Sequence, residues 1–430
     1  MAASNKPLDL ENLRKLVEGD AVAIRGKATL EPAGGAGDKV FPPTHSVDER
    51  RATTRYAFET RRLAGDEITC VLLDSVQSQA NRMEEALQLL WESKSISLPV
   101  VAVDLSTCAP EVGVVTSLTA PHRVSDALLR DSMTEGGTLF RMSDLGRSFT
   151  DATARNAAPL FKICPTGLVF GIWDSTGPRG GLGSKFARAL VSEIVGVGAT
   201  AGSKTVSRID PASIVTNAGP VFIAKAPGAD GKPTWTHDVM SAKPVKDGKP
   251  PTGIDDVGAV QKWGEGSKAG KPSAINHSNI PPTIDDVAGG VTIDYAQHTV
   301  VLSLAGLRKL GFGGGDVEAR TVLAALGLLA VLAAQERGHD LRSRCLLVPR
   351  PGKSLALESV ARDGTPTPLS LDFPQAISLF KEAVSALPEP IRFTTQPGEP
   401  LATLTPSPKL AHLITKSREL AATEAEVEGD

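Results

Sequence analysis

Apolar and polar side chains alternate along residues 22 to 30, which is the period of a β-strand. One parity is apolar or small, comprising Val22, Ile24, Gly26, Ala28 and Leu30. The other parity carries Arg25 and Lys27. The pattern therefore predicts a half-buried strand with a basic open face.

A second strand and a helix follow from the pattern of residues 68 to 91. Residues 68–73 (ITCVLL) form an apolar run that predicts a buried strand. Apolar residues then recur at helical spacing: Val76, Ala80, Met83, Leu87 and Leu90. Asp74 or Ser75 can cap this helix. Outside the apolar stripe, its first turns carry uncharged hydrogen-bonding groups such as Gln79 and Asn81, where a solvated face favours Glu, Lys and Ala.

The last part of the chain shows a similar succession of strands and helix. Residues 290–293 and 299–304 are expected to be strands, and residues 317–337 a strongly apolar helix. Residues 341–348 predict a further strand, on which Arg342 and Arg344 lie opposite Cys345 and Leu347. A late strand, like the early one, is therefore expected to carry a basic stripe.

Residues 225–271 interrupt this regular pattern. They contain eight lysines and six acidic residues among many Gly and Pro, with little periodicity. Such composition indicates a flexible insertion or a long loop. We therefore divide the chain into a discontinuous core (1–224 and 272–412), this insertion (225–271) and an acidic C-terminal tail (413–430).

Composition and charge narrow the class of protein. The chain has 430 residues, of which 41% are hydrophobic and 22% charged, and this excludes a wholly disordered chain. The formal net charge is −3, but the last twelve residues carry five acids and no base. A weakly positive body with local basic patches is compatible with a nucleic-acid partner.

The spacing of the cysteines and the distribution of apolar residues indicate in which cellular compartment the protein is expected. Cys70, Cys108, Cys164 and Cys345 are far apart in sequence, which predicts buried free thiols without a zinc or redox motif. The amino end lacks an apolar signal-peptide core, and the most apolar run, residues 322–334, is too short to span a bilayer. We therefore expect a cytoplasmic protein with no membrane span.

No catalytic motif is complete in this sequence. The glycine-rich stretch 177–186 places Lys185 after Ser184, an order that differs from a phosphate loop, and residues 311–316 carry Asp316 where a dinucleotide motif needs Gly. The seven histidines show no metal-ligand spacing. His277 is the candidate general base, although a polar loop histidine is the favoured interpretation. We expect no catalytic residue, no metal and no cofactor.

Basic and hydrogen-bonding side chains gather in several segments of the chain. Arg and Lys neutralise phosphates, whereas Ser, Asn and Gln bond phosphate or 2′-hydroxyl oxygens. A solvated surface with ordinary salt bridges is the alternative, and composition alone favours it.

Long ordered strings in these segments resemble a known family. They are VAIRGKATLEP (22–32), FPPT (41–44), LLDSVQSQANRMEEAL (72–87), GIWDSTGPRGGLGSKFARALVSEIVG (171–196), KPSAINHSNIPP (271–282), GGVTIDYAQHTVVLSLAGLRKL (289–310) and LRSRCLLVP (341–349). The sequence resembles the backbone subunit of the type I-G (formerly I-U) CRISPR Cascade complex, in the repeat-associated mysterious protein (RAMP) superfamily. The likeness extends over most of the chain.

The resemblance implies an α+β fold, a modified RRM-like or ferredoxin-like βαββαβ core with large insertions. Residues 22–30 would be its first strand and 74–91 its first helix. Residues 317–337 would be the second helix and 341–348 the last strand.

The resemblance also implies a role in antiviral defense. Family members bind the guide (crRNA) and polymerise along it as a helical filament for RNA-guided recognition of foreign DNA. The implied partners are the CRISPR RNA, target DNA through guide pairing, head-to-tail copies of the chain and other Cascade subunits. It implies that the chain is not an enzyme. Two alternatives remain: an endoribonuclease that processes precursor CRISPR RNA with His277 or His122 as general base, and an oligomeric protein without RNA.

Candidate RNA-binding residues follow from polarity within the resembling motifs. They are Arg25, Lys27, Arg50, Arg51, Arg55, Tyr56, Ser75, Gln79, Asn81, Arg82, Arg179, Lys185, Arg188, Ser273, His277 and Asn279.

Overall fold

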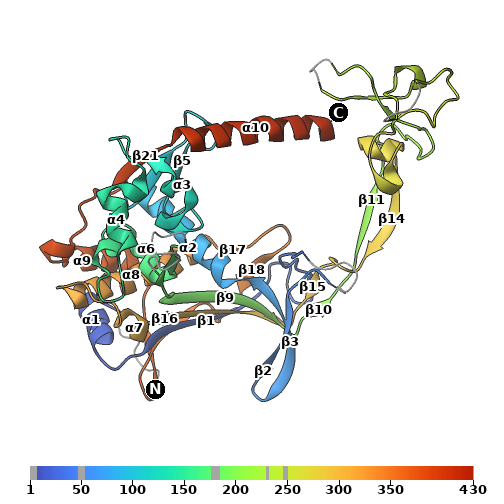
Figure 1. The fold of residues 1–430 in the computed structure, drawn as a ribbon. Helices are drawn as coiled ribbons and strands as arrows, with labels where there is room; N and C mark the ends of the chain where they lie inside the picture. Colours follow the sequence, from blue (N-terminus) through green and yellow to red (C-terminus); the bar gives the residue numbers. More distant parts are fainter. Residues whose placement is uncertain (1–6, 47–53, 176–184, 229–231, 246–249, 430) are drawn as a thin grey trace. The chain divides into compact units, whose positions relative to one another are not determined.

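The chain divides into two compact units (Figure 1). The computed structural model describes residues 7–46, 54–175, 185–228, 232–245 and 250–429. The first unit comprises residues 1–202 and 290–411, and the second residues 203–289 and 412–430. The second unit contains residues 225–271, and the two strands that flank this Lys-rich stretch pair with each other.

The first unit has an α+β fold built on an antiparallel sheet. Its central strands lie in the order β18 (Leu346–Pro349), β1 (Ala23–Pro32), β16 (Tyr295–Ser303) and β9 (Leu190–Val197). Numbered along the chain, this is the order 4-1-3-2 of a ferredoxin-like βαββαβ core. Helix α2 (Val76–Glu92) lies in the connection from β1 to β9, and α8 (Asp316–Glu336) in the connection from β16 to β18. The predicted RRM-like fold is confirmed.

One face of this sheet is covered by helices. Figure 1 shows α2 and α8 on the same side of β1, β16 and β9. Helix α8 is apolar on nearly all sides because it packs against the sheet, α2 and α9 (Phe373–Ser385). In the described part of the chain, α8 is the one helix whose length and composition would suffice to cross a membrane, and 72% of its most apolar window is buried inside the protein.

The opposite face of the sheet is partly open. Along β1, the side chains of Ile24, Ala28 and Leu30 are buried and that of Lys27 is exposed, so the predicted alternation is confirmed. The hairpin of β2 (Phe58–Leu63) and β3 (Asp66–Asp74) extends the sheet beyond β9. On the open face it forms a small second core, in which Cys70 packs with Val195 and Val197.

The late strand begins five residues after the predicted start. Leu341 to Cys345 form a tight turn, closed by hydrogen bonds from Cys345 N–H to the Arg342 carbonyl and from Leu341 N–H to the Cys345 carbonyl. Arg344 has a left-handed φ of 58° there. The prediction that Arg342 and Arg344 lie on a strand face is therefore wrong. The turn gives the same alternation of polar and apolar residues as a strand. It directs the Arg342 side chain toward the start of α2, where it donates a hydrogen bond to the Leu73 carbonyl.

The edge of β1 is shared by two successive strands. After β18, the chain leaves β1 and returns to it as β19 (Ala356–Val360), which also pairs with β20 (Pro366–Leu369). Strand β17 (His339–Asp340) pairs with β18 at the edge of the sheet.

The other elements of the first unit surround this core. The helices are α1 (Leu10–Glu18), α3 (Ala127–Arg130), α4 (Asp144–Thr150), α5 (Ala158–Phe161), α6 (Pro165–Phe170) and α7 (Leu304–Leu307). The strands are β4 (Val101–Asp104), β5 (Val114–Thr116), β6 (Ser132–Met133), β7 (Ile172–Trp173), β8 (Lys185–Phe186), β10 (Thr200–Ala201), β15 (Val291–Thr292) and β21 (Ala402–Pro406). Strands β5, β4, β21 and β6 form a separate small sheet, in which β4 and β21 are parallel.

The second unit is built on an antiparallel ribbon of β11 (Lys204–Arg208) and β14 (Ile280–Asp285). Between these strands, β12 (Phe222–Ile223) pairs with β13 (Trp235–Thr236). Phe222, Val239, Ala242 and Val260 form a small apolar cluster. So few core residues, widely spaced in the chain, leave no periodic signal in the sequence. The predicted acidic tail lies in α10 (Pro408–Gly429).

Candidate nucleic-acid interface

The start of α2 is organised around a buried carboxylate. Ser75, one of the two cap residues that the sequence allows, is the N-cap, and its hydroxyl accepts a hydrogen bond from Ser78 N–H at 3.2 Å. The preceding Asp74 is fully buried and accepts hydrogen bonds from Gln79 Nε2 (2.7 Å) and Arg82 Nε (3.0 Å). Arg342 reaches the other carboxylate oxygen at 3.2 Å. These donors compensate the desolvated charge.

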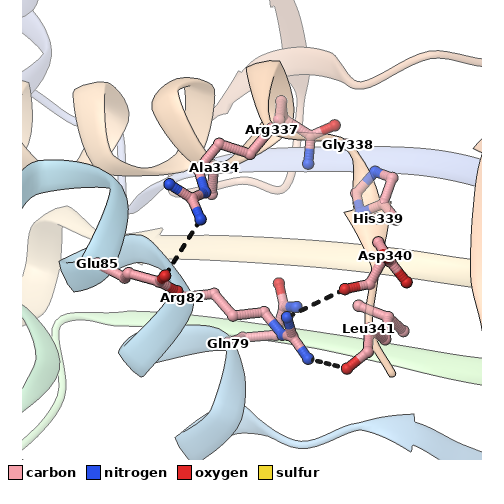
Figure 2. Close-up of a pocket in the computed structure, with 10 residues that line it drawn as sticks. Gln79, Arg82, Glu85, Ala334, Arg337, Gly338, His339, Asp340 and Leu341 are labelled. Carbon is pink, nitrogen blue, oxygen red and sulfur yellow. Dashed lines mark hydrogen bonds and ion pairs between the residues drawn. The ribbon is translucent and has the colours of Figure 1, made fainter. Parts of the chain in front are cut away.

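Arg82 also joins α2 to the turn before β18. Its guanidinium donates hydrogen bonds to the carbonyl oxygens of Asp340, at 3.4 Å, and Leu341 (Figure 2). The Arg82 side chain remains 32% exposed. It therefore holds two elements together while presenting part of its guanidinium to solvent.

A polar pocket of about 430 Å³ opens beside Arg82. Gln79, Arg82 and Glu85 line it from α2, and the end of α8 and β17 supply the other walls (Figure 2). Arg337 forms an ion pair with Glu85 at 3.1 Å across this pocket. Two arginines thus face Glu85 and Asp340, so the lining is nearly neutral and rich in hydrogen-bonding groups.

Two buried histidines, one of them in the pocket wall, are in contact with each other. His298 Nε2 lies 2.8 Å from Ser192 Oγ, which donates to Gln79 Oε1 at 2.8 Å. Burial, together with the nearby His339, lowers the pKa of His298 to about 3. Burial and the positive charge of Arg82 also lower the pKa of His339. Both imidazoles are therefore neutral near pH 7.

One ring nitrogen of His339 lacks a hydrogen-bond partner among the described residues. Its side chain lines the pocket and is only 6% exposed, and its Nε2 atom has no hydrogen-bond partner among the described residues. Its ring meets that of His298 edge-on, with the ring centroids 5.4 Å apart. Sequence spacing could not reveal this pair, because β16 and β17 lie on either side of α8 in the chain.

Two further candidates, Arg25 and Lys27, lie on the open face of β1. Arg25 forms an ion pair with Glu358 of β19 at 2.5 Å. Lys27 is exposed, opposite Thr299 of β16. The open face therefore carries less uncompensated positive charge than the sequence suggests.

Six candidates come from the loop before β2, from α2 and from the glycine-rich segment. Arg50, Arg51 and Arg179 lie outside the described residues. Tyr56 is buried, and its hydroxyl accepts a hydrogen bond from Gly290 N–H at 2.9 Å. Arg55, beside it, is exposed, as is Asn81 on α2.

Lys185 and Arg188 are exposed near β8. Lys185 Nζ lies 5.0 Å from the ring centroid of Trp173, an aromatic residue that the sequence analysis did not select. Trp173 lies opposite Lys185 in the hairpin of β7 and β8, on the other side of a glycine-rich segment. A search for an aromatic residue and a lysine that flank such a segment would have found this pair.

The remaining candidates belong to the second unit. His277 Nδ1 lies 3.3 Å from a carboxylate oxygen of Asp210, and Asn279 Oδ1 accepts a hydrogen bond from Asp210 N–H at 2.7 Å. Asp210 is buried, and the main-chain N–H of Ser278 is the first of several donors that lower its pKa. Ser273 lies in the short 3₁₀ helix just before them.

Comparison with known protein families supports a CRISPR connection. Residues 24–201 match the family model described as CRISPR-associated protein GSU0053 (Cas_GSU0053). The match indicates a CRISPR-associated protein. No curated protein matches the chain at a significant level. The matched segment contains β1, α2 and β9, and therefore the first strand, first helix and second strand of the core, together with Arg82 and Lys185.

Proposed function

We propose that this chain is the guide-RNA-binding backbone subunit of a type I-G Cascade complex, a RAMP protein that polymerises along CRISPR RNA. The observation that carries the proposal is the CRISPR-associated match over the first half of an RRM-like core. RRM-like sheets commonly bind single-stranded RNA. A binding role also agrees with the incomplete catalytic motifs, and we propose that the chain is not an enzyme.

The distribution of charge supports contacts with the RNA phosphates. A guide subunit must hold many different sequences, so it has to grip phosphate and sugar more than base edges. Lys27, Lys185 and Arg188 are exposed and available for such contacts. Arg25 and Arg82 are engaged by Glu358 and Asp74, which keeps the net charge of a repeated subunit low.

Assembly along the guide requires surfaces that bind a neighbouring copy. The ribbon of the second unit exposes Ile209 and Ile284, which are 84% and 76% accessible to solvent. Contact with a neighbouring copy would remove these side chains from water. A repeated head-to-tail contact that does not close generates a helical filament.

The proposed function is tested by sequencing the RNA that copurifies with the chain from cells containing its partner proteins and a CRISPR array. We expect RNAs of uniform length that contain repeat and spacer sequence and cover all spacers. A folded protein that emerges free of RNA would contradict the proposal. Binding that weakens steeply as salt rises would support phosphate contacts.

Processing of precursor CRISPR RNA is the second candidate function. It is favoured by the proximity of His277 to buried Asp210, an arrangement that orients an imidazole for general base catalysis. The 2′-hydroxyl of the RNA would be the nucleophile. Cleavage of precursor RNA by the unaltered chain, lost in His277→Ala and kept in His122→Ala, would favour this function over the binding role.

A further inference from the structure

Trp173 is exposed on β7, where its side chain is 58% accessible to solvent. It is the one large aromatic side chain among the described residues that is this exposed. The other described tryptophans are buried or half-buried. Exposure of so large an apolar ring indicates a contact outside the fold.

The hairpin that carries Trp173 is firmly anchored. Strand β7 pairs with β8 so that Ile172 lies opposite Phe186 and Trp173 opposite Lys185. The first pair points inward, and each of its side chains is only 6% exposed. The second pair points outward because side chains alternate along a strand. The indole is thus displayed by a packed support.

Hydrogen bonds on either side of Trp173 fix its main chain further. The carbonyl of Gly171 accepts a hydrogen bond from Arg123 at 2.9 Å. Arg123 is itself held by the buried Glu84 through two bonds of 2.6 Å. On the other side, Asp174 is buried and pairs with Arg141 at 2.5 Å. Little main-chain entropy therefore remains to be lost at this position on binding.

A cation beside the indole gives it a specific chemistry. Lys185 Nζ lies 5.0 Å from the indole centroid, within the range of a cation–π interaction. Arg188 is exposed three residues farther along the chain. An aromatic face next to an ammonium group suits an unpaired nucleobase, which stacks, and its phosphate, which pairs with the cation.

We propose that Trp173 is a stacking platform for an unpaired nucleobase of RNA, with Lys185 on an adjoining phosphate. The proposal rests on the RNA-binding function above. It adds a contact that tolerates any base, since every base presents a π face. It also supplies the aromatic side chain that the open face of β1 does not offer.

The first test compares variants of the full chain for binding to a single-stranded oligouridylate. Trp173→Ala is expected to weaken binding at least about fivefold without changing the salt dependence, because stacking releases no counterions. Lys185→Ala is expected to reduce the slope of log affinity against log salt by about 0.7. Met142→Ala, which removes another exposed apolar side chain, is the matched control and is expected to bind unchanged.

The second readout is tryptophan emission. RNA is expected to quench the unaltered chain, and Trp173→Phe is expected to remove most of that quenching. Trp235→Phe is expected to retain it. Thermal unfolding should be nearly unchanged in Trp173→Ala because the ring is mostly exposed, so a folding defect will not imitate the effect.

The outcomes separate this inference from the proposed function. RNA binding by the unaltered chain with equal affinity in Trp173→Ala would overturn the stacking role and leave the proposed function standing. Failure of the unaltered chain to bind RNA would overturn both. A changed oligomeric state with unchanged RNA affinity would place Trp173 against another protein copy and overturn the inference.

Discussion

At the scale of single residues, several side chains selected for RNA binding also stabilise the fold. Arg82 bonds a buried carboxylate and two carbonyl groups, and Tyr56 bonds a main-chain amide. Hydrogen-bonding ability is visible in the sequence, but it does not reveal whether the partner is RNA or the protein itself. Lys27, Lys185 and Arg188 are among the candidates whose side chains remain exposed to solvent.

Arg82→Ala is expected to lower the free energy of unfolding by about 2 kcal/mol, because it removes one cation from a buried carboxylate and frees two carbonyls. Chemical denaturation of the purified chain measures this. The double variant Arg82→Ala, Asp74→Asn should lose less unfolding free energy than the sum of the losses in the two single variants, because the two side chains interact. Additive losses would contradict a direct pairing. RNA affinity of Arg82→Ala must be measured well below its lowered melting temperature.

Stability is also expected to depend on pH through His298. Its folded pKa of about 3 is below its ordinary value of 6.5, so the unfolded chain binds the proton more readily. The contribution of His298 is complete above pH 6.5 and is lost as pH falls, by about 1.4 kcal/mol per pH unit. Denaturation between pH 7 and 4.5 should show a shallower decline in His298→Gln. Equal slopes would show that His298 does not set this dependence.

At the scale of elements, the burial of α8 against the sheet explains why its bounds could be predicted from the sequence better than those of the next strand. The sequence located α8 within one residue at each end, because its apolar residues form a long uninterrupted block. The strand after it was placed less well, since the turn at 341–345 imitates the alternation of a strand. The alternation of apolar and polar residues indicates only which side chains are buried. It does not distinguish a strand from a turn in which tertiary contacts bury every second side chain.

Gly327 of α8 faces Leu302 of β16 and Leu190 of β9. A Cβ there would lie 3.4 Å from Leu302 Cδ1 and 3.6 Å from Val169 Cγ1, which is ordinary contact. Gly327→Ala is therefore expected to stabilise the chain by up to about 1 kcal/mol through helix propensity. Gly327→Leu should destabilise it by about 1–3 kcal/mol through overpacking. Thermal unfolding distinguishes these signs, and tolerance of leucine would contradict the close packing.

At the scale of the whole molecule, the two units differ in the basis of their stability. The first has a continuous apolar core between the sheet and its helices, whereas the second relies on a ribbon and a small cluster. The ends of the insertion are adjacent in the first unit, where Gly202 N–H donates to the Gly290 carbonyl at 2.8 Å. The insertion is therefore attached without breaking the core.

Replacing residues 203–289 by a short glycine linker is expected to leave the first unit folded, with a cooperative thermal transition close to that of the full chain. Circular dichroism and thermal unfolding measure this outcome. A deletion variant that forms only aggregates, or melts without cooperativity, would show that the core needs the insertion. Retained quenching of Trp173 by RNA in the variant would locate that contact in the first unit.

The sequence by itself determined the alternation along β1 and the two core helices, because each is encoded by side chains close together in the chain. The α+β class followed from the resemblance of the sequence to a known family. The long motifs of the sequence also indicated the CRISPR association that the family match supports. The pairing of Asp74 with Arg82 and Arg342, the His298–His339 pair and the display of Trp173 were decided by tertiary structure alone. Each joins residues from different elements, and such contacts depend on the path of the chain in three dimensions.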